Sequence, residues 1–202
     1  LKYFLSIVLV SIISLLLVMQ PDIGQTLLII FSWGVLIFTS GINIFILFGL
    51  SLFAFISLAY LIMFIPKFDY IQSRIFSFFN RDTGTHNFQS DKAIESITSG
   101  GYFGKGIGEG TLKNRVPEAH TDYIISVISE EFGVVAIMLI LLLFLMFIYM
   151  VFKKINYEKD NRIKLVLIGC VSLILMQATI HIGVNIRLFP TTGMTLPFLS
   201  YG

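Results

Sequence analysis

The sequence predicts an all-α polytopic membrane protein with about five transmembrane helices and one large extracytoplasmic loop. Of its 202 residues, 56% are hydrophobic and only 13% are charged, whereas soluble domains usually carry about 25% charged residues. Mean hydropathy is +0.88, and the apolar residues gather in runs that approach the roughly 20 residues needed to cross a hydrocarbon core. We therefore expect a single membrane domain over residues 1–202.

The first three helices are predicted over residues 3–19, 25–39 and 42–65. Gln20-Pro21-Asp22-Ile23-Gly24 interrupts the first apolar run, Ser40-Gly41 ends the second and Pro66 stops the third. Proline ends helices because it lacks the backbone N–H that the helix needs. Asp22 would either cap the second helix or touch a substrate, and the cap is favoured.

The fourth and fifth helices are predicted over residues 123–152 and 163–184, the fourth beginning beside a cluster of ionisable groups. The tail over residues 185–202 holds two prolines and two glycines. It is predicted to be a loop or a re-entrant segment of the kind that lines cavities at membrane depth.

Charge in the connection between the fourth and fifth helices sets the expected orientation. Residues 153–164 carry five Lys or Arg against Glu158 and Asp160, and short basic loops stay in the cytoplasm. Alternation then places residues 20–24, the polar stretch 66–122 and the tail 185–202 outside the cytoplasm. We expect these three segments to converge on one extracytoplasmic face.

Composition also argues against several classes of function. The net charge of +2 leaves no basic stripe for nucleic acid. Cys170 is the only cysteine, and His86, His120 and His181 lack a metal-ligand spacing. No metal ligands are predicted, although a loosely held divalent ion stays open.

The long polar stretch contains two local patterns. Residues 89–98 place Ala93, Ile94 and Ile97 on one side of a short helix, which suits an amphipathic helix on the membrane surface. Residues 100–110 follow with six glycines. They would form either a flexible turn or, with Lys105, a cradle for a phosphate, and the residues alone favour the turn.

Asp122 precedes the fourth helix and has two competing roles. As a helix cap it would accept backbone N–H groups, and as a general base it would need a tuned pKa. Ser126 and Glu130 follow on the same helix face, where a helix-packing network is the favoured role. His181 and Asn185 share a face of the fifth helix and are expected to bond between helices.

Several strings together resemble the SEDS family of polytopic membrane proteins. They are Gln20 to Gly24, Gln89-Ser90 with Gly100-Gly101 and residues 104–110, Pro117 to Asp122 with Glu130 to Gly133, and Asn185 to Gly202. Their order and spacing cover nearly the whole chain. Glu118-Ala-His and Gly193-Met-Thr-Leu-Pro are more similar to the division branch of the family than to its elongation branch.

The resemblance implies a ten-helix fold, of which this chain would supply about five helices, with four missing upstream and the last downstream. It implies a peptidoglycan glycosyltransferase that polymerises lipid II at the division septum of the bacterial inner membrane, with a class B penicillin-binding protein transpeptidase and other divisome membrane proteins as partners. Asp122 would be the catalytic base of an inverting transfer. A divalent cation, Mg²⁺ or Mn²⁺, would help near the pyrophosphate.

The remaining candidates fall into two sets. Candidates for substrate binding are Gln89, Lys105, Lys113, Arg115, Glu118, His120 and Thr121, the three cations on charge alone. Candidates for structural motifs are Gln20, Pro21, Asp22, Gly100, Gly101, Asn185, Pro197 and Ser200. Some division-type relatives carry a Lys where this chain has Thr192, so any pyrophosphate role there falls to another cation, or to none.

Two other functions stay open. A lipid II flippase would need a pathway with ionisable groups at mid-depth, but the first three predicted helices have no charged residue in their interiors. A non-catalytic scaffold that recruits a transpeptidase would not need the carboxylate of Asp122.

Overall fold

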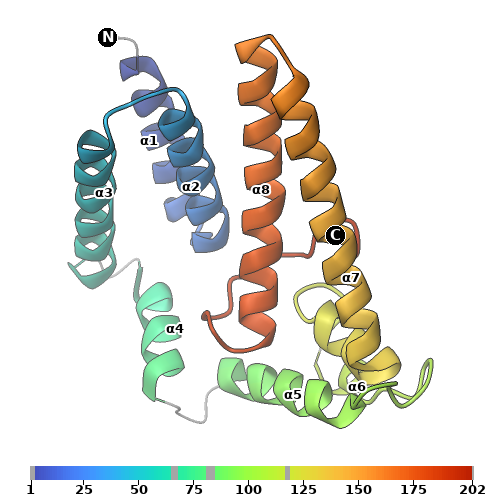
Figure 1. Ribbon diagram of the computed structural model, residues 1–202. Helices are drawn as coiled ribbons and strands as arrows, with labels where there is room; N and C mark the ends of the chain where they lie inside the picture. The colour runs from blue at the N-terminus through green and yellow to red at the C-terminus, as the bar shows by residue number, and fades with distance from the viewer. Residues whose placement is uncertain (1–2, 65–67, 81–84, 117–118, 202) are drawn as a thin grey trace. The chain divides into compact units, whose positions relative to one another are not determined.

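The computed structural model describes residues 3–64, 68–80, 85–116 and 119–201, and within these ranges every regular element is a helix. This confirms the all-α prediction. The elements, in chain order, are α1 (Phe4–Met19), α2 (Ile23–Thr39), α3 (Ile44–Phe64), α4 (Asp69–Asn80), α5 (Thr85–Gly100), α6 (Leu112–Arg115), α7 (Ile124–Tyr157) and α8 (Asn161–Asn185) (Figure 1).

Two of these helices, α7 and α8, are long and apolar enough to cross a membrane, and α1, α2 and the first part of α3 are shorter apolar helices. Helix α7 runs five residues beyond its predicted end at 152. Lysine is a good helix former that suits the negative end of a helix, and Lys154 lies in the last turn. The connection to α8 therefore shrinks to residues 158–160.

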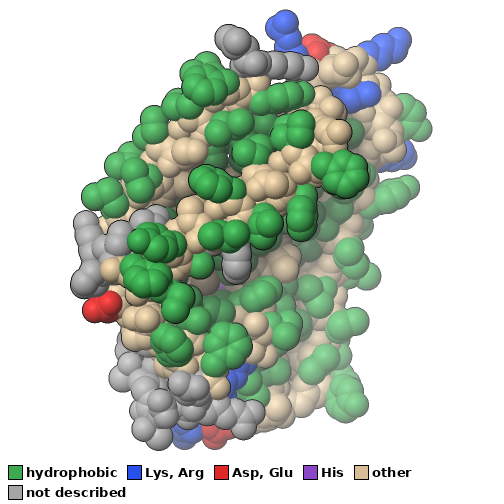
Figure 2. Space-filling view, turned by 90° about the vertical axis from the view of Figure 1, so that its left-hand side faces the viewer, with side chains coloured by type: hydrophobic (Ala, Val, Ile, Leu, Met, Phe, Trp, Pro, Cys, Tyr) green, Lys and Arg blue, Asp and Glu red, His purple; other side chains and the backbone are tan. Residues whose placement is uncertain are grey.

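The chain divides into two compact units. Unit 1 comprises residues 1–76 and 158–176, and unit 2 comprises residues 77–157 and 177–202. In unit 1, the side chain of Asp22 caps α2 by accepting the N–H of Gln25 at 2.9 Å, which confirms the predicted cap. Hydrophobic side chains dominate the surface of the unit 1 helices in Figure 2, as expected for helices that face lipid.

The stretch predicted as one large extracytoplasmic loop, residues 66–122, contains three helices, α4, α5 and α6, and its place outside the cytoplasm stays a prediction. The short helix expected over 89–98 exists but extends over Thr85–Gly100. Its side chain at Ala93 is fully buried, and Ser90 and Gly100 on the same side contact Tyr123 and the backbone of Ser129. The side of α5 that carries Ser90, Ala93 and Gly100 is therefore covered by protein, while Ile94 and Ile97 are half-buried.

Helix α7 is broken at Gly133, so the prediction of one uninterrupted helix over 123–152 was wrong. Gly133 has φ +78° and ψ −176°, which are not helical values. Glycine adopts such angles readily because it has no Cβ. The residues before the break carry buried polar groups, and those after it form the exposed apolar run.

Candidate functional site

The glycine segment, residues 100–110, docks on the break in α7. A break in a helix leaves backbone N–H and carbonyl groups without hydrogen-bond partners. The glycine segment supplies the missing partners. The N–H groups of Lys105 and Gly106 donate to the carbonyls of Glu130 and Glu131 at 2.9 and 3.1 Å. In return, the N–H of Val134 donates to the carbonyl of Gly101 at 3.0 Å.

This docking requires glycine at the contact points. A Cβ on Gly100 would overlap the carbonyl oxygen of Ser129, and a Cβ on Gly104 would overlap that of Glu131. The segment is therefore ordered by close backbone packing, and the favoured interpretation as a flexible turn was wrong for residues 100–106. The amides of Lys105 and Gly106, which a phosphate cradle would use, are already bonded.

Glu130 fixes the far end of the same segment. Its side chain is 1% exposed and accepts three hydrogen bonds. Oε1 accepts from Lys105 Nζ at 2.8 Å and from Thr111 Oγ1 at 3.0 Å, and Oε2 accepts from the N–H of Leu112 at 3.0 Å. A buried carboxylate needs this kind of pairing. Glu130 thus joins α7 to the start of α6, rather than packing one long helix on another.

The turn that carries Asp122 is held by the end of α8 and by the tail. Asn185 is fully buried, and its Nδ2 donates to the carbonyls of Asp122 and His181, both at 2.9 Å. Its Oδ1 accepts from the N–H and the hydroxyl of Ser126 at 3.2 and 2.7 Å. All four hydrogen-bonding positions of the amide are used. Asn185 therefore caps α7 and fixes the backbone of Asp122 together.

The tail adds a second clamp. Ser200 Oγ donates to the carbonyl of Thr121 at 2.9 Å and accepts the N–H of Leu196 at 2.8 Å. His181 Nδ1 donates to the carbonyl of Met194 at 2.8 Å. The tail lacks regular structure, as predicted, but these bonds hold it in place against α8 and the Asp122 turn.

The carboxylate of Asp122 faces the tail. Its Oδ2 lies 3.8 Å from the position that a Cβ on Gly193 would occupy. Asp122 and Thr121 are half-buried, while His120 is exposed. A half-buried carboxylate on a fixed backbone is a group that can accept a proton from a bound hydroxyl group.

Comparison with known proteins identifies the family of the chain. Residues 1–202 match the profile of the FtsW, RodA and SpoVE family, described as cell cycle proteins. The chain belongs to this family. It is 37% identical over 188 residues to the "Probable peptidoglycan glycosyltransferase FtsW" of Caulobacter vibrioides, covering 93% of this chain and 47% of the relative. A relative of the same name from Enterococcus hirae is 32% identical over 214 residues, covering 100% and 54%.

A solved structure shares the fold. It belongs to a peptidoglycan synthase complex solved to show structural coordination of polymerization and crosslinking, with a TM-score of 0.72 and 24% identity. The match covers 99% of this chain and 56% of that chain. The chain thus spans about half the length of the FtsW relatives that it matches.

The structure brings together only some of the predicted site residues of this FtsW/RodA/SpoVE-family chain. Asn185, Ser200 and Thr121 join the Asp122 turn, and Gly100 and Gly101 join the break in α7. Gln89 lies half-buried on α5, and Pro197 lies in the tail. Arg115 is half exposed, 4.0 Å from Glu95 Oε1. Glu118 and the side chain of Lys113 lie outside the described residues. Gln20, Pro21 and Asp22 belong to unit 1.

Sequence reasoning missed two contributors to the site. Thr111 was not singled out, and no pattern in the sequence indicates its bond to Glu130. Gln177 was also missed, although a lone amide in an apolar helix signals a polar partner; its Nε2 donates to the carbonyl of Thr195 at 3.0 Å. Both residues fix loops rather than meet a substrate.

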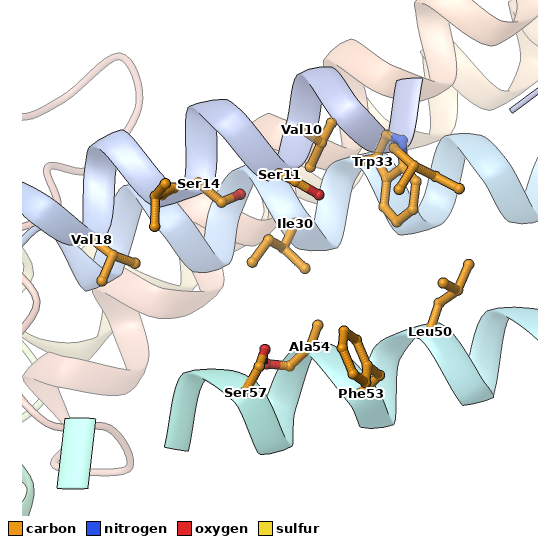
Figure 3. Close-up of a pocket in the computed structure, with 12 residues that line it drawn as sticks. Val10, Ser11, Ser14, Val18, Ile30, Trp33, Leu50, Phe53, Ala54 and Ser57 are labelled. Carbon is orange, nitrogen blue, oxygen red and sulfur yellow. Dashed lines mark hydrogen bonds between the residues drawn. The ribbon is translucent and has the colours of Figure 1, made fainter. Parts of the chain in front are cut away.

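The chain also has a cavity of about 300 Å³ within unit 1. Figure 3 shows side chains from α1, α2 and α3 around it, among them Ser14, Trp33 and Phe53. Its lining is apolar apart from serine hydroxyls and the indole N–H, and it includes no acid or base. This cavity therefore offers no group for acid–base chemistry, unlike the turn that carries Asp122.

Proposed function

We propose that the full-length protein is a peptidoglycan glycosyltransferase that polymerises lipid II into glycan strands during septal wall synthesis. The observation that carries the proposal is the carboxylate of Asp122, half-buried on a backbone that Asn185 and Ser200 fix. The names of the FtsW relatives support it. The protein would cross the inner membrane about five times within this chain and act at the division septum.

The proposed reaction is an inverting transfer with Asp122 as the general base. Asp122 takes the proton of the acceptor sugar's 4-hydroxyl, and that oxygen attacks the anomeric carbon of the lipid-linked donor chain. The bond from this carbon to the pyrophosphate breaks, and the lipid pyrophosphate leaves with the electron pair. Because the leaving group is already stabilised, the step needs no separate general acid.

Two candidates for charge near the pyrophosphate each pair with a carboxylate. Lys105 Nζ donates to the buried Glu130 Oε1 at 2.8 Å, whereas Arg115 lies 4.0 Å from the exposed Glu95 Oε1. The longer and more exposed pair makes Arg115 the better candidate to meet an anion. In the described parts of the chain, no three His, Cys, Asp or Glu side chains gather to hold a metal. The mechanism therefore takes no step through Mg²⁺ or Mn²⁺, and any such ion would rely on the pyrophosphate oxygens.

The test compares Asp122→Asn with the wild type in full-length protein, purified with its class B transpeptidase partner and given labelled lipid II. Loss of a positioned base typically lowers a rate by about 10²- to 10⁴-fold, so we expect glycan polymer on a gel from the wild type alone. Asp160→Asn is the matched control. Asp160 is exposed in the α7–α8 connection, and asparagine caps helices as well as aspartate.

Unfolding curves and partner binding of both variants establish that they fold. Equal polymer from Asp122→Asn and wild type would rule out the base role. No polymer from the wild type would instead support the flippase or the scaffold. Transport of lipid II across vesicle membranes would then indicate the flippase, and partner recruitment without transport would indicate the scaffold.

A further inference from the structure

Three large apolar side chains project from the glycine segment with nothing described against them. Tyr102, Phe103 and Ile107 are 77%, 84% and 81% exposed. We call these three residues the apolar tip. An exposed group of large apolar side chains on an ordered loop marks a surface that contacts something apolar. The tip is ordered because hydrogen bonds fix its backbone to α7.

The apolar run of α7 locates the edge of the membrane. Residues 132–152 contain no charged side chain, and Glu131 and Lys153 bound the run. These 21 residues span about 32 Å as a helix, close to the roughly 30 Å of a hydrocarbon core. Gly133 therefore lies at one boundary of the hydrocarbon and Phe152 at the other.

The tip is attached at this boundary. The N–H of Val134 donates to the carbonyl of Gly101 at 3.0 Å, and that of Val135 donates to the carbonyl of Tyr102 at 3.3 Å. The exposed apolar surface of α7 begins at the same residues, since Val135 and Met138 are 54% and 61% exposed. The tip and the lipid-facing side of α7 are thus continuous at one depth.

We propose that the apolar tip inserts into the headgroup–acyl boundary of the bilayer and fixes the depth of the glycine segment. Tyr102 suits this boundary because tyrosine is apolar with a polar hydroxyl. Phe103 and Ile107 supply apolar side chains, as the apolar face of an interfacial helix does. Lys105 lies between Phe103 and Ile107 in sequence, and its ammonium donates to Glu130 rather than projecting with the tip. The proposal concerns membrane contact and does not depend on the proposed transferase reaction.

Fluorescence quenching in nanodiscs tests the proposal in the full-length protein. A chain with every other tryptophan replaced by phenylalanine, Trp33 included, provides the background for Phe103→Trp. Lipids brominated near the headgroup or near the chain end report its depth. Leu142→Trp, at the middle of the apolar run 132–152 and 57% exposed, is the control for a residue deep in the hydrocarbon. Thr98→Trp, on the exposed side of α5, is the control for a residue outside it.

We expect Phe103→Trp to lose several-fold more emission than Thr98→Trp, and to be quenched more by lipids brominated near the headgroup. Leu142→Trp should show the opposite preference for bromine depth. If neither bromine position quenches the Phe103→Trp emission, the proposal is overturned. Quenching by aqueous iodide would then show that the indole is in water, and no quenching by iodide would show that another protein surface covers it. Ile107→Trp repeats the measurement independently, in case Phe103→Trp fails to fold.

Discussion

Unit 1 and unit 2 differ in the kind of contact that stabilises each of them internally. In unit 1, hydroxyls such as those of Ser6, Thr39 and Ser51 donate to carbonyls of their own helix or the residue before it. Among the described side-chain hydrogen bonds of unit 1, the one between residues far apart in sequence runs from the Tyr3 hydroxyl to the Ser40 carbonyl and is 3.4 Å long. In unit 2, side-chain bonds join segments far apart in sequence, such as that from Arg187, just after α8, to Asp91 on α5.

This difference separates the apolar helices of unit 1 from the polar network around the site in unit 2, which also contains the long apolar run of α7. Helices in lipid associate mainly through van der Waals packing, which tolerates small shifts. A general base must meet its proton within hydrogen-bond reach, so its backbone has to be fixed by directional contacts. We expect substitutions that disturb backbone packing or polar links in unit 2 to have much larger effects than matched substitutions in unit 1.

The largest difference is expected between Gly104→Ala and Gly41→Ala. Both glycines have positive φ, +78° and +89°, and an L-residue there costs about 1–2 kcal/mol. At Gly41 nothing lies within 4 Å of the new Cβ, whereas at Gly104 it overlaps the Glu131 carbonyl. We expect Gly104→Ala to lose more than about 4 kcal/mol in detergent-titration unfolding. Equal losses at the two sites would mean that the glycine segment does not dock on α7.

Asn185→Asp tests the clamp on the Asp122 turn. The substitution keeps the shape but replaces the amide donor with an oxygen that faces the carbonyls of Asp122 and His181. Two hydrogen bonds disappear and oxygen meets oxygen, which should cost about 2–4 kcal/mol and lower kcat for glycan synthesis. Asn114→Asp, on the exposed side of α6, should change stability by less than about 0.5 kcal/mol. If both variants behave alike, Asn185 does not fix the turn.

The sequence predicts local features, such as apolar helices and caps, better than it predicts contacts between distant segments. Continuous apolar runs and helix stops located α1 to α3, and Asp22 was correctly placed as a cap, because both signals are local. The break at Gly133 was missed, since a glycine inside a helical pattern is usually tolerated and its reason lies 30 residues earlier in the glycine segment. Asn185 was expected to bond between helices, but its four partners depend on how α7, α8 and the tail meet.

Glu130→Gln tests the link between the glycine segment and α7. A carboxylate offers acceptors only, whereas an amide must turn its NH₂ group toward one set of donors. The bond from the Leu112 N–H or those from Lys105 and Thr111 are then lost. We expect a loss of about 1.5–3 kcal/mol, the range for hydrogen bonds to charged groups, measured by detergent-titration unfolding at neutral pH.

Glu95→Gln is the matched control for that substitution. Glu95 is exposed, and its hydrogen bond and charge interaction with Lys92 lower its pKa. A lowered folded-state pKa contributes stability above the unfolded pKa, and this is lost as pH falls through the folded pKa. Solvent screens such a pair, so Glu95→Gln should hardly move the unfolding curve at neutral pH. A loss as large as that of Glu130→Gln would contradict the distinction between buried and exposed carboxylates.

The smallest effects should come from serine hydroxyls, where the two units can be compared by one substitution. Ser14 Oγ is buried in unit 1 among the described atoms without a hydrogen-bond partner, whereas Ser126 Oγ in unit 2 donates to Asn185 Oδ1 at 2.7 Å. Removing an unbonded hydroxyl loses little, so Ser14→Ala should change the free energy of unfolding by less than about 0.5 kcal/mol. Ser126→Ala should lose about 1 kcal/mol, the net value of one hydrogen bond. A larger loss at Ser14 would show that its hydroxyl has a partner in the membrane, and that unit 1 also depends on directional contacts.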